Sequence, residues 1–176
     1  MRKLVTLMSI AMLVAFSSFD RKPKEVEIPC KQEGLSDSQY FRASGSAKSK
    51  DMASAKDKSL LVAKQTLASL ISSTIESVSS SYSSSISGNS NSFKEAFETL
   101  TRETVNQQLK NVSIICQKVN KSKEGYEVFT AVEMSKVKLV DAITTNAQEN
   151  DNLKTSFDEQ KFREIFEAEM KKIQAE

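Results

Sequence analysis

The chain contains no histidine among its 176 residues, and it contains only four glycines and two prolines. The missing imidazole excludes Ser-His-Asp and Cys-His catalytic arrangements, the HExxH motif of zinc proteases and most zinc or copper sites. The scattered glycines leave no GxGxxG fingerprint and no phosphate-binding loop. We therefore expect a protein that is not an enzyme and that has no catalytic residues, no cofactor and no metal site.

One short pattern is compatible with nucleophilic catalysis. Ser135 and Lys138 have the SxxK spacing of penicillin-binding enzymes. In those enzymes the nucleophilic serine needs a lysine one helical turn away. The companion SDN-like and KTG elements are missing, and Ser135 stands where the N-cap of a helix belongs. We expect Ser135 to be a helix cap. No isolated pair of carboxylates indicates a glycosidase.

The first 18 residues have the pattern of a cleavable export signal. Residues 1–3 form a basic tip, residues 4–16 carry no charge, and the small residues Ser17 and Ser18 follow. An apolar stretch of about 7–15 residues between such flanks is typical of a secretory signal peptide, whereas a membrane span needs about 20. We predict a signal peptide over residues 1–18. A buried N-terminal helix or strand and a retained signal-anchor are the alternatives.

The mature protein is expected to be formally neutral. The whole chain has 25 lysines and arginines against 23 acidic residues, and the signal removes Arg2 and Lys3 but no acid. Nucleic-acid binding requires a basic domain with clustered lysines and arginines, so we expect no nucleic-acid partner. Contact with a membrane is expected only through the signal peptide, before it is cleaved.

The two cysteines, Cys30 and Cys116, allow a disulfide in an exported protein. The bond would tie a polar leader, residues 19–39, to the rest of the chain. It would close a loop of about 85 residues, which the chain-entropy model credits with about 4 kcal/mol. Two unpaired thiols are the alternative. A lipidated Cys30 is disfavoured because residues 27–29 (EIP) do not form a lipobox, so we expect a released protein.

Apolar periodicity and turn signals predict a single α+β domain over residues 40–176. Alternating apolar and polar residues indicate strands, whereas apolar residues at spacings of three and four indicate helices. The predicted strands are 40–47, 112–119 and 126–134, and the predicted helices are 49–84, 92–109, 137–144 and one that begins near Ser156. This strand-helix-helix-strand-strand-helix-helix order predicts a small antiparallel sheet with helices packed on one face.

Three local details accompany this prediction. Gly45 indicates a close approach of another element to the first strand, most simply of the helix that follows it. The serine-rich run from Ser79 onward predicts that the long helix frays or bends there, because serine is a poor residue for a helix interior. Ser92 and Ser156 each begin a capping-box pattern and therefore mark expected helix starts.

Three segments carry a family resemblance: the strand 41–45 (FRASG), the helix with Ala53, Ala55, Lys58, Ala63, Leu67 and Ala68, and the strand 131–134 (AVEM). With these segments the chain resembles the twenty-kilodalton envelope lipoprotein family of Gram-negative bacteria, over roughly residues 38–140. The resemblance implies a strand-helix-strand-strand core related to dodecin-like folds, in an envelope protein without known enzymatic activity. The lipobox of the family is missing here, and the leader and tail are similar to those of uncharacterised exported proteins of Bacteroides-type bacteria.

The leading functional hypothesis is a non-catalytic interaction or structural protein of the periplasm or cell envelope, with outer-membrane association left open. Its partner would be an envelope protein or a second copy of the chain. A binding module for a small ligand or a cell-wall glycan is the alternative. An enzyme that works through lysine, serine or carboxylate groups is a third hypothesis, and Ser135 carries its only motif.

Overall fold

A computed structural model describes residues 27–86 and 91–175 of the chain. The predicted signal peptide, residues 1–18, and the first part of the leader lie outside the described residues. Strands and helices follow in the order strand, helix, helix, strand, strand, helix, helix, with a 3-10 turn over Leu109–Asn111 before the second strand. The structure confirms the α+β class and the small antiparallel sheet.

The sheet consists of β1 (Tyr40–Ser49), β3 (Gly125–Ser135) and β2 (Ser113–Ser122), which lie side by side in that order. Both pairs of neighbours are antiparallel. β2 and β3 form the predicted hairpin, which turns at Lys123 and Glu124. The central strand β3 is the most buried, whereas β1 and β2 form the two edges of the sheet.

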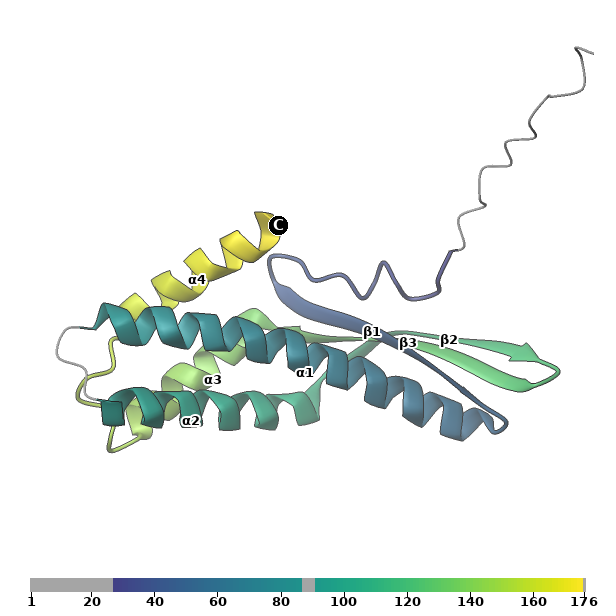
Figure 1. Cartoon of the computed structure of the whole chain (residues 1–176), viewed down its shortest axis with the longest axis horizontal. Helices are drawn as coiled ribbons and strands as arrows, with labels where there is room; N and C mark the ends of the chain where they lie inside the picture. The colour runs from purple at the N-terminus through teal and green to yellow at the C-terminus, as the bar shows by residue number, and fades with distance from the viewer. Residues whose placement is uncertain (1–26, 87–90, 176) are drawn as a thin grey trace, which may run out of the picture.

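Helix α1 (Met52–Ser85) runs the length of the molecule, and its first half lies along one face of the sheet (Figure 1). Its 34 residues span about 50 Å. Gly45 allows the contact, because a Cβ atom at this position would lie 2.5 Å from the backbone nitrogen of Ala63. The close approach predicted at Gly45 is therefore confirmed. Ser59 and Thr130 join helix and sheet by a buried hydrogen bond of 2.8 Å between their hydroxyl oxygens.

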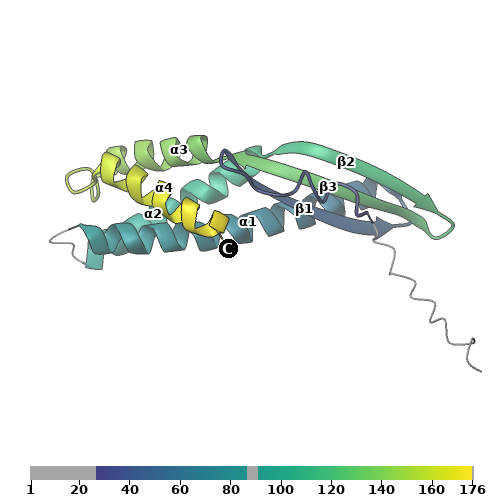
Figure 2. The ribbon, with the colours of Figure 1, turned by 90° about the horizontal axis from the view of Figure 1, so that it is seen from above.

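The other helices lie mainly beyond the end of the sheet, along the second half of α1 (Figure 2). They are α2 (Asn91–Gln108), α3 (Lys136–Glu149) and α4 (Glu159–Ala175). We expected several helices over one face of the sheet, but in the described residues one helix lies along it. The reason is the length of α1: only its first half is needed to cover the short sheet, and its second half supplies the apolar surface for a helical end.

An aromatic cluster forms the centre of the helical end. The ring of Tyr82 on α1 lies 5.0 Å from that of Phe97 on α2 and 5.5 Å from that of Phe162 on α4, measured between centroids. The Tyr82 hydroxyl accepts the backbone N–H of Asp158 at 2.8 Å, so the only polar atom of this ring is satisfied. Burial raises the pKa of Tyr82 to about 12. Tyr82 thereby fastens the start of α4 to α1.

We predicted the long helix over residues 49–84, with fraying or a bend from Ser79 onward, and α1 continues as a helix through the serine-rich run to Ser85. Serine costs about 0.5 kcal/mol relative to alanine in a helix interior, which is small beside the burial of aromatic side chains. The small side chains of Ser79 and Ser83 are buried among the helices and leave room for their close packing. Tertiary packing therefore overrides local propensity at this end of α1.

Two other boundaries differ from the prediction. Helix α3 continues to Glu149 instead of ending near residue 144, because Ala147 on its inner face is fully buried. Helix α4 begins at Glu159, after Asp158, whose carboxylate accepts the N–H of Lys161 at 3.0 Å. Ser156 therefore is not the cap, and it lies in the preceding turn.

Candidate functional site

The leader crosses the face of the sheet opposite α1. Cys30 and Cys116 form the predicted disulfide, with their Cα atoms 5.6 Å apart, which ties the leader to β2. Further along, Gly34 lies so close to Ser44 of β1 that a Cβ atom would meet the Ser44 side chain at 2.7 Å. The leader then follows β1, where the Ser36 hydroxyl accepts the backbone N–H of Arg42 at 2.8 Å. The disulfide to β2 and the hydrogen bond of Ser36 to the β1 edge thus fix the leader on the sheet.

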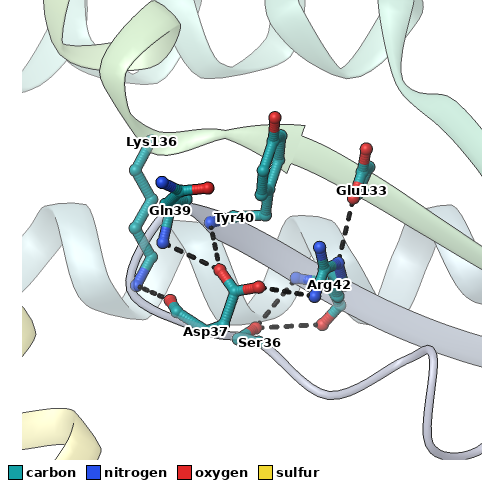
Figure 3. Close-up of polar contacts among 7 residues, drawn as sticks. All are labelled: Ser36, Asp37, Gln39, Tyr40, Arg42, Glu133 and Lys136. Atoms are coloured by element: carbon teal, nitrogen blue, oxygen red, sulfur yellow. Dashed lines mark hydrogen bonds and ion pairs between the residues drawn. The ribbon is translucent and has the colours of Figure 1, made fainter.

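Asp37 is the centre of a polar cluster where the leader enters β1 (Figure 3). Its carboxylate accepts the backbone N–H groups of Gln39 and Tyr40, both at 2.8 Å, and Arg42 donates to it from Nη1 at 2.6 Å. These bonds lower the pKa of Asp37, with the backbone N–H of Gln39 as the largest cause. Arg42 also donates from Nε to Glu133 on β3 at 2.9 Å, which raises the pKa of Arg42. The cluster is a chain of satisfied charges.

Lys136 completes this cluster from the first residue of α3. Its Nζ donates to the backbone oxygen of Asp37 at 2.7 Å and lies 4.9 Å from the centroid of the Phe41 ring (Figure 3 shows the first contact). The residue is only 6% exposed, and burial lowers the pKa of its ammonium group. Among the described residues, no carboxylate forms an ion pair with it. Lys136 is thus a buried cation with spare hydrogen-bonding capacity.

A cavity of about 320 Å³ opens beside Lys136, between α3 and α4. Val137, Val140, Phe166 and Met170 form its apolar walls. Lys171, Arg163 and Glu167 of α4 and Ser38 of the leader complete the lining. The lining therefore combines four apolar side chains with the buried basic residue Lys136.

A second candidate surface is the free edge of β2. Except for Cys116, every residue of this strand is exposed, including Ile114 at 50% and Val119 at 39%. Lys118 and Lys121 are its charged residues, and it has no acidic residue. A β-bulge interrupts its pairing with β3 between Ile114 and Cys116. From Cys116 to its end the strand is regular and leaves one row of backbone groups without a strand neighbour in the described chain.

Ser135 has the role of a helix cap. Its hydroxyl accepts the backbone N–H of Lys138 at 3.3 Å at the start of α3, as we expected from its position. The same oxygen would be the nucleophile in an SxxK mechanism. Helix capping therefore accounts for a serine three residues before Lys138.

Sequence reasoning missed the polar cluster and both candidate surfaces. Asp37 had a readable signal, because an aspartate that precedes a strand and bonds to the N–H groups two and three residues onward is a common turn motif. The pairing of Arg42 with Glu133 spans 91 residues and has no local signal. Within the described ranges no cluster of cysteine, aspartate and glutamate has a metal-binding arrangement. In the same ranges, none of the helices is both long and apolar enough for a membrane span.

Comparisons with models of protein families, with curated proteins and with solved structures find no significant match for this chain. The resemblance to the envelope lipoprotein family, and the dodecin-like core that it implies, stay predictions.

Proposed function

We propose that the protein is an exported, non-catalytic interaction module of the periplasm or cell envelope, whose β2 edge binds an extended acidic segment of a partner protein. A free strand edge is a template for an added strand, in which main-chain hydrogen bonds give affinity and side chains give specificity. The observation that carries the proposal is the exposure of every residue of β2 except Cys116. The opposite edge, at Arg42 of β1, is covered by the leader.

The side chains of β2 specify the chemistry of the partner. Ile114 and Val119 pair with the buried Val132 and Val128 of β3, so they stand on the α1 side of the sheet and offer apolar contacts. Lys118 pairs with Phe129 and stands on the other side, where it offers positive charge. A segment that alternates apolar and acidic residues fits both sides. A second copy of β2 would bring lysines together, and like charges placed opposite each other in a sheet are unfavourable.

The binding test uses the mature chain and two extended peptides of about eight residues, one alternating valine with glutamate and one alternating valine with lysine. We expect the glutamate peptide to bind at least about tenfold more tightly in calorimetry, and to slow hydrogen exchange of the β2 amides. The double substitution Ile114→Ser and Val119→Ser should weaken this binding. Leu61→Ser is the control, because Leu61 is 56% exposed but lies on α1.

Three results would overturn the proposal for β2. They are equal affinity for the two peptides, unchanged exchange of the β2 amides on binding, and a dimer of the chain that the Ile114 and Val119 substitutions dissolve. The last result would assign the edge to a second copy. The three results can be told apart: sedimentation detects the dimer, calorimetry compares the two affinities, and hydrogen exchange shows where the peptide binds.

Export is the second part of the proposal, and the disulfide supports it because such bonds persist in oxidising compartments. In a Gram-negative host that expresses the full chain, we expect the processed protein in the periplasmic fraction, with its N-terminus near Ser18. Replacing Arg2 and Lys3 by glutamate should retain the unprocessed chain in the cytoplasm. An unprocessed wild-type chain in the cytoplasm would contradict export without bearing on the β2 edge.

A further inference from the structure

The cavity between α3 and α4 is independent of the β2 edge. Val137 lies at the cavity and is 63% exposed. The volume of about 320 Å³ is at the lower end of the range of about 300–1,000 Å³ for small-molecule sites. Its apolar walls would lose solvent-exposed area if an apolar chain occupied it.

The charges around the cavity favour an anion at one end. Arg163 is already neutralised, because it donates to Asp141 and to Glu159, each at 2.9 Å. Glu167 is the acidic residue of the lining, and Lys136 and Lys171 are its other cations. Lys136 has one hydrogen bond to a carbonyl oxygen, and an ammonium group can donate three.

Lys136 donates to the backbone oxygen of Asp37, but the Asp37 carboxylate is not its hydrogen-bond partner. Its carboxylate oxygens are engaged by Arg42 and by the N–H groups of Gln39 and Tyr40. Lys136 is also the first residue of α3, so the positive end of the helix dipole lies at the same end of the cavity. An anionic group there would form a charge-assisted hydrogen bond in a partly buried setting.

We propose that this cavity binds a small amphipathic carboxylate, such as a medium-chain fatty acid. Its acyl chain lies between the Val140, Phe166 and Met170 walls, and its carboxylate lies against the Lys136 ammonium, with Lys171 at the rim. The walls select an apolar chain, and the two lysines select the anionic head. This site does not depend on the strand edge of β2.

The test compares three ligands that share one chain and differ in the head group, at concentrations below micelle formation. We expect decanoate to bind the mature protein at least about tenfold more tightly than decanol, and decyltrimethylammonium to bind most weakly. NMR should show shifted methyl signals of Val137, Val140 and Met170 on titration with decanoate. Equal affinity for decanoate and decanol, or no shift with decanoate up to millimolar concentration, would overturn the proposal.

Variants test the two parts of the site separately. Lys136→Met keeps an unbranched side chain without the charge and should reduce decanoate binding to the level of decanol, whereas Lys138→Met, at an exposed position of the same helix, should leave it unchanged. Val137→Trp should block the cavity. Because Val137 is exposed, we expect this variant to fold even if the Lys136→Met variant does not. Unchanged decanoate affinity in Val137→Trp would place any binding elsewhere and sink the proposal.

Discussion

Glu169 is the acidic residue that ties α4 to the serine-rich end of α1. Its carboxylate accepts hydrogen bonds from the hydroxyls of Ser77 at 3.1 Å and Ser81 at 3.0 Å, and from Lys172 at 2.8 Å. These contacts lower the pKa of Glu169 below its ordinary value of 4.5, with the Lys172 bond as the largest cause. Ser77 and Ser81 are therefore partners of a charged group on another helix.

The depressed pKa of Glu169 predicts a pH dependence of stability. A carboxyl whose pKa is lower in the folded state stabilises the fold above its unfolded pKa, and this contribution is lost as the pH falls through the folded pKa. We expect Glu169→Gln to have a lower free energy of unfolding than the wild type at pH 7, and the gap to be smaller at an acidic pH below the ordinary pKa of 4.5. Urea unfolding at both pH values measures it. Glu167→Gln, at an exposed position of α4, is the control, and an equal gap at both pH values would contradict the prediction.

Two neighbouring serines of α1 should respond in opposite ways to alanine. The Ser79 hydroxyl is buried and has no hydrogen-bond partner among the described residues, whereas Ser81 donates to Glu169. Ser79→Ala removes an unsatisfied polar group and improves helix propensity, so it should stabilise the protein by about 1 kcal/mol. Ser81→Ala should destabilise it by up to about 1 kcal/mol. Thermal unfolding compares the two variants, and destabilisation by Ser79→Ala would show that its hydroxyl has a partner.

At the scale of elements, the start of α4 distinguishes two capping residues. Asp158 caps the helix through the N–H of Lys161, and Ser156, which the capping-box pattern predicts, lies in the turn. We expect Asp158→Ala to lower the free energy of unfolding by about 1 kcal/mol. Ser156→Ala should change it by less than about 0.5 kcal/mol. Chemical denaturation measures the free energy of unfolding of both variants. A larger loss for Ser156→Ala than for Asp158→Ala would show that Ser156 caps the helix, as the capping-box pattern predicts.

The strands show how an element can be predicted while its environment is not. The alternation in residues 112–119 indicates a strand with one buried side, and the strand exists as β2. Its apolar residues are nevertheless exposed, because α1 packs mainly on β1 and β3. The alternation of apolar and polar residues predicts a strand with two different faces. Whether the apolar face is covered depends on the position of α1, which the alternation does not predict.

At the scale of the whole molecule, the disulfide should stabilise the fold by holding the leader on the sheet. The bond joins residues 86 apart in sequence, and a loop of that length corresponds to about 4 kcal/mol in the chain-entropy model. We expect the double variant Cys30→Ser and Cys116→Ser to lose stability of that order, and the amides near Asp37 to exchange faster. Urea unfolding and hydrogen exchange measure the two effects. Equal denaturation midpoints for variant and wild type would show that the leader is held without the bond.

The sequence by itself was sufficient for the α+β class, the hairpin, the cap at Ser135 and the contact at Gly45. Each of these depends on neighbouring residues: on a period of two or of about 3.6, on a turn, on a capping hydroxyl or on a missing side chain. The disulfide was also predictable, because two cysteines admit a single intramolecular pairing.

Only the tertiary structure decided the helical end beyond the sheet, the exposure of β2 and the cavity beside Lys136. These features depend on which distant surfaces meet. Lys136 follows β3 and reaches Asp37, which lies 99 residues earlier in the chain. No local sequence period encodes the contact of Lys136 with Asp37, because that contact results from the burial of apolar area by the whole chain. The β2 edge and the cavity beside Lys136 are places where apolar side chains stay exposed after this burial.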